Sequence, residues 1–462
     1  MRKVQQATGR ELPAHLRDLY ERSGKGLTGQ EREDLRQLLI EYADVFAAHD
    51  LDLGCFNATP PTHTHTEDPC GGKNPDQTKN EEGSIHGFQG EEEKNLRAML
   101  EAGVIQPSTS SWASFPVLVR KKDGGVRWCL DFRRLNAVTK KDAFSLPSIS
   151  DCIESRAGNR YMSRLDMASG YWQIEIHPDG REYTALITRF GLFEHKRMSM
   201  GLCNALSTFQ RATSLVLREL TWKTVLAFLD EVLVLGKNFE DHIRNLREVL
   251  DRFREKLKPK KCVLLREKAK FLGKIVTGDS VSVDPESVEA VKTWPEPTST
   301  REVESFLGFV NYHREHIPHL GEKAASLYAL TGRTPFKWME EHHQAFCSLR
   351  EALLSAEVLA LPRKEEMFVL DADVSNVAVG GILSQMQHGS LRPIAFASKR
   401  LIAAQQKYCT TRKELLAVVT FTRQFRHYLL GRRFLIRTDH SSLAWLMRFK
   451  DLEGQLSRWL EE

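Results

Sequence analysis

Two adjacent acidic residues between two short apolar runs constrain this chain more than any other feature. Asp230 and Glu231 lie inside the run Val225–Leu235, whose other residues are almost all apolar. Such runs on either side of a short polar step predict a tight β-hairpin with carboxylates at its tip. Neighbouring side chains of a strand point to opposite faces, so both acids reach one site only through a turn. Taken alone, the motif also fits a solvated acidic turn.

A third acid strengthens the hypothesis of a metal site. Asp166 ends the strand-like run Arg160–Asp166 and could meet Asp230 across a sheet. Clustered carboxylates are the oxygen ligands that Mg²⁺ binds, and two-metal phosphoryl transfer depends on them. Tyr171 follows five residues later. Its ring could exclude a ribose 2′-hydroxyl beside such a site, and the alternative for this residue is a place in the core.

Basic residues surround a second turn, at Asp123-Gly124. Lys122 precedes the glycine and Arg127 follows it, between the apolar runs Val117–Arg120 and Val126–Leu130. This pattern predicts a hairpin whose basic side chains could hold the charge of a triphosphate. A solvated basic turn is the alternative.

Composition sets broad limits. A length of 462 residues predicts roughly three domains. The net charge of +5 permits a nucleic-acid partner. The 8 cysteines form no CxxC pair, which argues against a zinc site or a disulfide framework. The sequence has neither a secretion signal nor a membrane-spanning stretch, so we expect an intracellular protein, cytoplasmic or nuclear and not secreted, with no membrane partner.

Apolar periodicity predicts the order of the elements. Residues 11–52 are expected to be helical, and the polar residues 57–90 to be a loop or disordered. The further helices are expected at 94–103, at 239–257, after the cap Ser299 and at 411–430. Beyond the hairpins, strands are expected at 161–167, 171–176, 367–370, 378–384 and 434–438.

Three acids near the C-terminus form a second candidate set. Asp373 and Asp439 lie beside apolar strand-like runs, and Glu414 lies near the start of a predicted helix. Glu414 also has a structural interpretation, because Thr411 and Glu414 match a capping box.

The order of several longer motifs identifies a family. They are Trp128–Asn136, Leu165–Gln173, Gly201–Ala205, Phe228–Glu231, Phe271–Gly273, Phe306–Gly308, Leu370–Ser375, Thr411–Ala417 and Arg437–His440. In this order the chain resembles the polymerase region of gypsy-type long-terminal-repeat retrotransposon polyproteins, a reverse transcriptase followed by ribonuclease H. The resemblance covers most of residues 11–52 and 91–462.

The resemblance implies an α+β multidomain fold, a right-hand polymerase (fingers, palm and thumb) followed by an α/β ribonuclease H-like domain. The implied domains are a helical leader at 1–56, a polar divergent segment at 57–90, fingers and palm at 91–278, thumb and connection helices at 279–361, and a ribonuclease H-like domain at 362–462, truncated at its C-terminus. The implied enzyme is an RNA-directed DNA polymerase that also hydrolyses the RNA strand of RNA–DNA hybrids.

The resemblance also assigns roles to single residues. It implies that Asp166, Asp230 and Glu231 bind metal in the palm, and that Asp373, Glu414 and Asp439 do so in the ribonuclease H-like domain. It implies that Lys122 and Arg127 contact the incoming triphosphate and that Tyr171 is the gate against ribonucleotides. The implied cofactor is Mg²⁺, two ions per active site, with Mn²⁺ as a substitute. The implied partners are an RNA template, a DNA primer, an RNA–DNA hybrid and deoxynucleoside triphosphates.

The chain also departs from its family. Glu231 replaces the usual aspartate, Met198–Gly201 replaces the usual Met-Pro-Phe-Gly, and Leu206 stands in place of a proline. Residues 66–90 have an unrelated composition, and Glu462 precedes the segment expected to supply a fourth ribonuclease H carboxylate. The alternative is therefore a decayed, catalytically impaired copy that at most binds nucleic acid. The sequence leaves the oligomeric state open.

Overall fold

The computed structural model describes residues 11–56, 89–120, 126–154, 158–253, 255–332 and 335–438. Its contacts divide the chain into two units, Met1–Ala269 and Lys270–Glu462. Each unit has its own core and is described by itself.

A four-stranded antiparallel sheet forms the centre of the first unit. Its strands are β7 (Val225–Phe228), β8 (Glu231–Gly236), β4 (Tyr161–Asp166) and β9 (Val263–Arg266), in that order across the sheet. Two amphipathic helices, α7 (Ala205–Val216) and α8 (Phe239–Arg252), share one apolar core with it. The predicted strands around Asp166 and Asp230 are confirmed, and α8 ends earlier than its predicted limit at residue 257.

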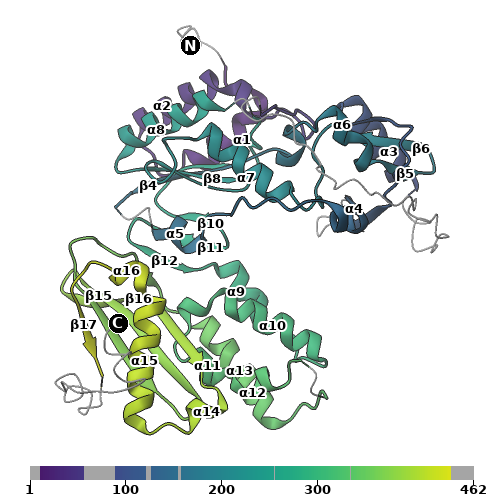
Figure 1. The fold of residues 1–462 in the computed structure, drawn as a ribbon. Coiled ribbons are helices and arrows are strands. Elements are labelled where there is room, and N and C mark those ends of the chain that lie inside the picture. The colour runs from purple at the N-terminus through teal and green to yellow at the C-terminus, as the bar shows by residue number, and fades with distance from the viewer. Residues whose placement is uncertain are drawn as a thin grey trace. The chain divides into compact units, whose positions relative to one another are not determined.

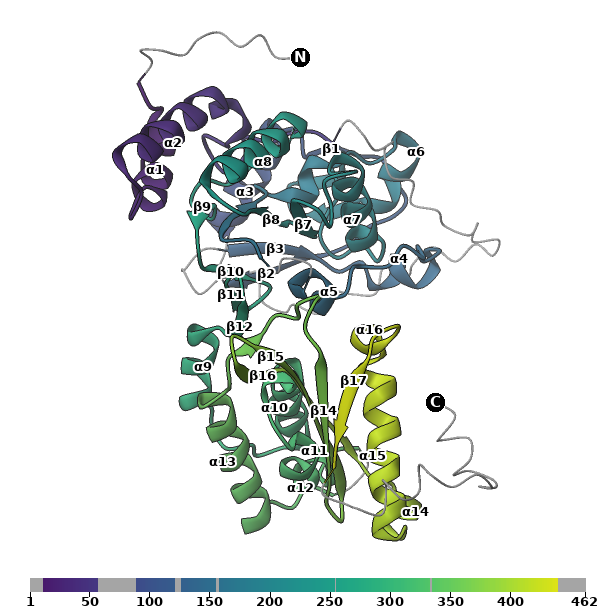
Figure 2. The same ribbon diagram turned by 90° about the vertical axis from the view of Figure 1, so that its left-hand side faces the viewer.

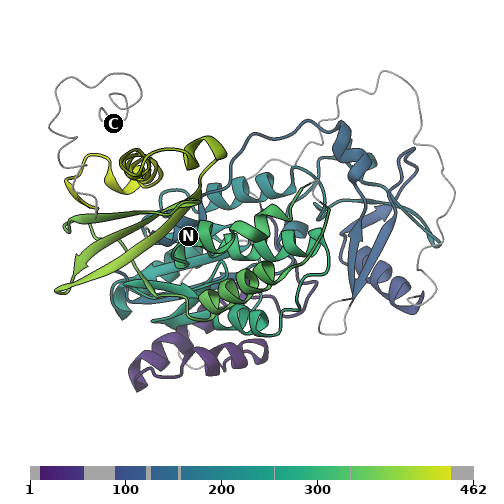
Figure 3. The same cartoon turned by 90° about the horizontal axis from the view of Figure 1, so that it is seen from below.

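The N-terminal residues are helical, as predicted, and belong to the same core. They form η1 (Ala14–Leu16), α1 (Arg17–Ser23), α2 (Gly29–Glu41) and η2 (Ala43–Val45). Thr28 caps α2, because its side chain accepts a hydrogen bond from Glu31 N while Glu31 accepts one from Thr28 N. Leucines of this leader pack into the core of the central sheet, and Figure 3 shows α1 and α2 in purple.

The remaining elements of the first unit are α3 (Gln89–Glu101), β1 (Ile105–Pro107), β2 (Pro116–Arg120), β3 (Val126–Leu130), α4 (Arg133–Val138), α5 (Ile149–Glu154), α6 (Pro178–Arg181), η4 (Glu182–Thr184), β5 (Leu186–Thr188) and β6 (Gly191–His195). Of these, α3, α4, α6, β5 and β6 lie together at the end of the unit opposite α2, and α5 lies apart from them (Figure 1). Strands β2 and β3 form the predicted hairpin, and β1, β6 and β5 form a small sheet. Gly103, with φ of +64°, follows α3, which covers most of the helix predicted at 94–103 and begins earlier, at Gln89.

The predicted strand at 171–176 is wrong. The chain instead forms the short helix η3 (Gly170–Gln173). A Cβ atom at Gly170 would lie 2.8 Å from Cζ of Phe209, so only glycine fits where the chain turns. Gln173 then fixes the turn, because its Nε2 donates to the carbonyls of Ala168 and Lys256 at 2.7 and 2.9 Å.

The second unit begins with a small sheet and a group of helices. The sheet joins β10 (Ala269–Phe271), β11 (Lys274–Val276), β12 (Ser280–Val283) and β13 (Leu359–Ala360). The helices are α9 (Pro285–Lys292), α10 (Thr300–Tyr312), η5 (Arg314–His316), α11 (Leu320–Lys323), α12 (Ala325–Ala329) and α13 (Glu340–Leu354). Ser299 caps α10 as predicted. The predicted limits at 278 and 361 lie within or beside this sheet, and the five predicted domain ranges stay predictions.

A second, larger sheet completes this unit. Its order is β16 (Ser390–Arg400), β15 (Ala378–Gln387), β14 (Phe368–Val374) and β17 (Phe434–Arg437), with β17 parallel to β14. Helix α15 (Thr410–Gln424) lies on one face, followed by α16 (Arg426–Leu429), while α10 to α13 lie on the other (Figure 2). The short α14 (Ala403–Gln406) precedes α15. Strand β16 was not predicted from the sequence.

Candidate functional site

The predicted acidic hairpin exists, and its turn is as short as a hairpin allows. Phe228 pairs with Glu231, so only Leu229 and Asp230 form the turn. Leu229 has φ of +53°, a left-handed conformation that costs a residue with a side chain about 1–2 kcal/mol. Asp230 therefore lies on the turn itself, while Glu231 is the first residue of β8.

A buried glutamine holds this strained turn. Gln210 of α7 is 2% exposed, and its Oε1 accepts a hydrogen bond from Leu229 N at 2.8 Å. Its Nε2 donates to the carbonyl of Ala227 at 3.2 Å. One side chain thus binds both the end of β7 and the turn, and it stabilises a turn that Leu229 would not favour on its own.

Asp166 lies next to this hairpin. It pairs directly with Glu231 across β4 and β8, so these two side chains leave the sheet on the same face. Met167 N donates to the backbone carbonyl of Asp230 at 3.2 Å. The charge of Asp230 contributes to raising the pKa of Asp166, so the two carboxylates interact electrostatically.

Burial dominates the electrostatics of Asp166. The residue is 6% exposed, and burial raises the pKa of its carboxyl above the ordinary value. The Lys261 ammonium lowers this pKa. It lies 3.1 Å from Oδ1 and 3.2 Å from Oδ2, and it donates a hydrogen bond to Oδ2. Oδ1 is buried and receives no hydrogen bond. Sequence reasoning missed Lys261, because it lies in the basic stretch 256–261 that resembles a solvated surface.

Asp166, Asp230 and Glu231 do not form one cluster of metal ligands. Within the described ranges, no group of three His, Cys, Asp or Glu side chains is arranged to hold a metal ion. Asp230 lies on the two-residue turn, whereas Glu231 is the first residue of β8. Asp166 is paired with Lys261 instead. The structure thus brings Asp166 and Asp230 into electrostatic contact, and the convergence of all three acids is not observed.

Tyr171 packs against the core of the first unit, and its predicted role as a gate stays a prediction. Its ring centroid is 5.2 Å from that of Phe209. Burial, followed by the charge of Asp230, raises the pKa of its hydroxyl. The ring therefore packs on Phe209, while the negative charge of Asp230 acts on its hydroxyl.

Of the two residues predicted to contact the triphosphate, only Arg127 lies within the described residues. Arg127 lies on β3, where its backbone pairs with Val119. Lys122 falls outside the described residues. The roles of both residues stay predictions.

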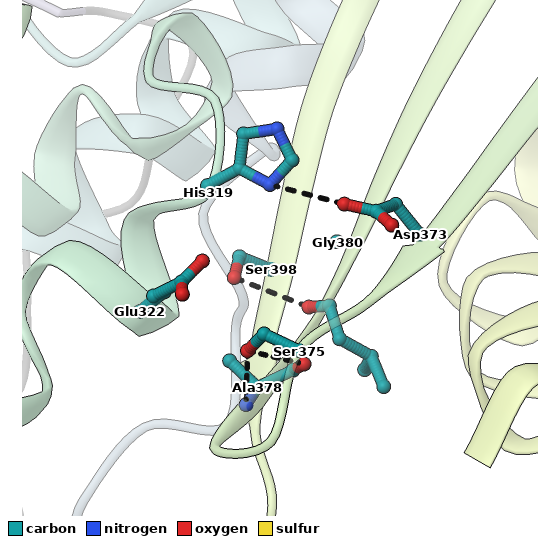
Figure 4. A pocket seen from close by; sticks show the side chains of 8 residues that line it. His319, Glu322, Asp373, Ser375, Ala378, Gly380 and Ser398 are labelled. Carbon is teal, nitrogen blue, oxygen red and sulfur yellow. Dashed lines mark hydrogen bonds and ion pairs between the residues drawn. The ribbon is translucent and has the colours of Figure 1, made fainter. Parts of the chain in front are cut away.

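In the second unit, Asp373 lies in a small pocket (Figure 4). It pairs with Gly380, and its Oδ2 is 3.8 Å from Nδ1 of His319. Glu322, Ser375 and Ser398 also line this pocket. Residues 370, 372 and 374 of β14 face the core under α15, so Asp373 leaves the strand on the other face.

Glu414, a second predicted ligand of this unit, lies on a different element. Glu414 is 4% exposed in the first turns of α15, and its Oε2 accepts a hydrogen bond from Thr438 at 3.5 Å. The N-cap of α15 is Cys409 without a side-chain bond, so the predicted capping by Thr411 is wrong. Asp439 falls outside the described residues. The structure directs Asp373 to His319 rather than to Glu414, and the three-ligand set stays a prediction.

Comparison with known proteins fits this arrangement. Residues 119–276 match the reverse transcriptase (RNA-dependent DNA polymerase) family, and residues 338–436 match the RNase H-like domain found in reverse transcriptase. The chain is therefore a reverse transcriptase domain followed by a ribonuclease H-like domain. Solved foamy viral protease-reverse transcriptases share the fold. One in complex with double-stranded DNA has a TM-score of 0.81 at 20% identity, over 98% of this chain and 94% of that one.

The particular kind of reverse transcriptase follows from curated relatives in Drosophila melanogaster. The Pol polyprotein of transposon 297 is 36% identical over 80% of this chain and 35% of its own length. That of transposon opus is 32% identical over 93% and 44%, and that of gypsy 32% over 79% and 37%. The chain belongs to the gypsy-type retrotransposon polyproteins, as its motifs predicted, and spans less than half the length of these relatives.

Proposed function

We propose that this chain is an RNA-directed DNA polymerase that also hydrolyses the RNA strand of RNA–DNA hybrids. The observation that carries the polymerase is the buried carboxylate of Asp166 beside the strained hairpin that presents Asp230. Two acids, one at the end of a strand and one on a tight hairpin turn, are typical of an active site when burial and the charge of the second raise the pKa of the first, as they do for Asp166.

The residues present fit a divalent metal. The donor set consists of carboxylate oxygens, which suit Mg²⁺ and Mn²⁺. Oδ1 of Asp166 is a buried carboxylate oxygen with no hydrogen-bond donor, and the Lys261 ammonium lies 3.1 Å from it, in a place that a metal ion would have to take over. Asp166 and Asp230 would hold the metal, with Glu231 as a third ligand after a change of side-chain conformation. The bound ions would stabilise the charge of the attacking and leaving oxygens.

The chain's own residues supply the rest of the site. Tyr171 would exclude the ribose 2′-hydroxyl by shape, with its ring packed against that of Phe209 at 5.2 Å between centroids. Lys122 and Arg127 on the β2–β3 hairpin would hold the triphosphate of the nucleotide. Lys261 would keep the Asp166 carboxylate charged and oriented before a metal binds.

The partners follow from the same reading. The solved foamy viral proteins hold an RNA/DNA hybrid in one case and double-stranded DNA in another. We propose that this chain binds an RNA template with a DNA primer, an RNA–DNA hybrid and deoxynucleoside triphosphates. No described helix is long and apolar enough to cross a membrane. An intracellular location, cytoplasmic or nuclear and not secreted, stays part of the proposal.

For the second activity, Asp373, Glu414 and Asp439 would bind metal and direct water to the RNA strand. Asp373 would have to leave its contact with His319 to join them. The measurement is cleavage of the RNA strand in a labelled hybrid, with Asp373→Asn as the control. Equal cleavage by both proteins would assign the activity to other residues.

A catalytically impaired copy is the second candidate. It is favoured by Glu231 in place of an aspartate and by the lack of a three-ligand group among the described residues. Such a protein would bind a template–primer duplex without extending it. Fluorescence anisotropy with a labelled duplex would detect binding in either case.

Primer extension decides between the two candidates. The full chain is mixed with an RNA template, a labelled DNA primer, one deoxynucleotide and Mg²⁺. We expect incorporation that falls at least about 100-fold in Asp166→Asn, because a metal ligand is lost while the shape is kept. Binding without incorporation would support the impaired copy, and incorporation unaffected by Asp166→Asn would refute the proposed site.

A further inference from the structure

The segment 256–262 connects the N-terminal leader to the end of β4. On one side it pairs with the leader. Leu257 N donates to the carbonyl of Val45, and Ala47 N donates to the carbonyl of Leu257, both at 2.8 Å. These two backbone bonds attach the segment to residues that are distant in sequence.

On its other side, the same segment binds the end of β4. Lys258 N donates to the carbonyl of Asp166, and Ala168 N donates to the carbonyl of Lys256, both at 2.8 Å. Near the end of the segment, the Lys261 ammonium reaches the carboxylate of Asp166 at 3.1 Å. The backbone and the side chain of Asp166 are thus both fixed by residues 256–262.

Arg22 of α1 secures this segment from the leader. Its Nη1 donates to the carbonyl of Cys262 at 3.0 Å, and its Nη2 donates to the carbonyl of Pro259 at 3.0 Å. The two carbonyls lie on either side of Lys261. Asp18, one helical turn earlier, accepts from Nε of Arg22 at 2.8 Å and orients the guanidinium. The guanidinium group of Arg22 therefore fixes the backbone on both sides of Lys261.

We propose that the leader is a working part of the polymerase site, and that Arg22 is a positioning residue that acts on Asp166 through residues 256–262. The match to the reverse transcriptase family begins at residue 119, so it leaves the leader without a role. Hydrogen bonds join Arg22 to the segment 256–262, and a further hydrogen bond joins Lys261 of this segment to Asp166. The kinetic part of this inference rests on the proposed polymerase function.

The test compares Arg22→Met with Arg36→Met in the full chain. Both arginines lie in the leader, and their side chains are 32% and 30% exposed. Arg36 pairs with Glu33 in its own helix, at 2.8 Å, and serves as the matched control. The first readout is hydrogen exchange at the amides of Ala168 and Lys258 without nucleic acid. The second is the rate of single-nucleotide incorporation, with KM for the nucleotide.

We expect Arg22→Met to speed exchange at Ala168 and Lys258 but not in β7 and β8. We expect it to lower the incorporation rate by roughly tenfold with KM unchanged, since small displacements of a catalytic group cost rate. Arg36→Met should match the unchanged protein in both readouts.

Three results would overturn the inference. The first is hydrogen exchange at Ala168 and Lys258 that Arg22→Met leaves unchanged. The second is exchange that is faster by the same factor in every strand, which would show a general loss of stability. The third is an incorporation rate that Arg22→Met leaves unchanged although the protein incorporates nucleotide. If the unchanged protein incorporates nothing, the proposed function fails while the exchange readout still decides whether Arg22 holds the segment.

Discussion

Replacing Lys261 with methionine should expose the cost of burying the Asp166 carboxylate. Asp166 is 6% exposed, and the Lys261 ammonium lies 3.1 Å from its Oδ1. Breaking a fully buried pair costs about 3–5 kcal/mol, whereas an exposed pair contributes about 0–1 kcal/mol. The Lys261 side chain is 55% exposed, so solvent screens much of its charge. We therefore expect Lys261→Met to destabilise β4 by about 2 kcal/mol at neutral pH, between those limits.

The pH dependence gives this prediction its sign. Burial raises the pKa of Asp166 in the folded protein, and Lys261 is the main influence that lowers it, so Lys261→Met raises that pKa further. A carboxyl with a raised pKa favours the folded state below its unfolded pKa, near 3.9, and loses that stability as the pH rises through the folded value. The loss of stability caused by Lys261→Met should therefore be largest at neutral pH and disappear towards pH ~4.

Hydrogen exchange at the amides of β4 measures this opening free energy directly. The control is the same substitution in an Asp166→Asn background, where no buried charge is left to compensate and Lys261→Met should cost little. An equal deficit at neutral and acidic pH, or an equal deficit in the Asp166→Asn background, would show that Lys261 acts by packing and would refute the electrostatic reasoning.

Three further substitutions test other parts of the structure. Glu231→Asp should raise single-nucleotide incorporation, because it removes a methylene that displaces the third carboxylate; equal rates would show that Glu231 is tolerated. Tyr171→Ala should increase ribonucleotide incorporation relative to deoxyribonucleotide, and an unchanged ratio in a competition assay would leave Tyr171 as a core residue. Gly381→Ala should lower the midpoint of urea unfolding by a shift worth about 1–3 kcal/mol, since its Cβ would lie 2.6 Å from the Phe421 ring. An unchanged midpoint would mean that α15 moves away freely.

Much of the fold could be predicted because several of its strands are visible in the sequence as short apolar runs. The runs around Asp166 and Asp230 form strands that sequence periodicity marks clearly, and the two-residue turn follows from their spacing. The strand expected at 171–176 failed for a tertiary reason. Close packing of Gly170 on Phe209 turns the chain there, and no local pattern contains that contact.

Of the candidate site, only the acidic residues could be predicted from the sequence. Asp166 and Asp230 follow from the rule that carboxylates at neighbouring strand ends meet. Lys261 and Gln210 do not, because each acts across a distance in sequence that only the folded chain closes. Lys261 lies 95 residues from Asp166, and Gln210 lies 19 residues from Leu229. Their residue types carry no pattern that separates them from an ordinary surface lysine and an ordinary helical glutamine.

A crystal structure with Mn²⁺ and a template–primer duplex tests the central claim most directly, since anomalous scattering locates the ions. The account predicts Mn²⁺ bound between the carboxylates of Asp166 and Asp230, with Lys261 displaced from Asp166. Paired catalytic ions lie only ~4 Å apart, so carboxylates separated by more than about 8 Å could not share them. Such a separation, or Mn²⁺ absent while Lys261 still holds Asp166, would contradict the proposed polymerase site.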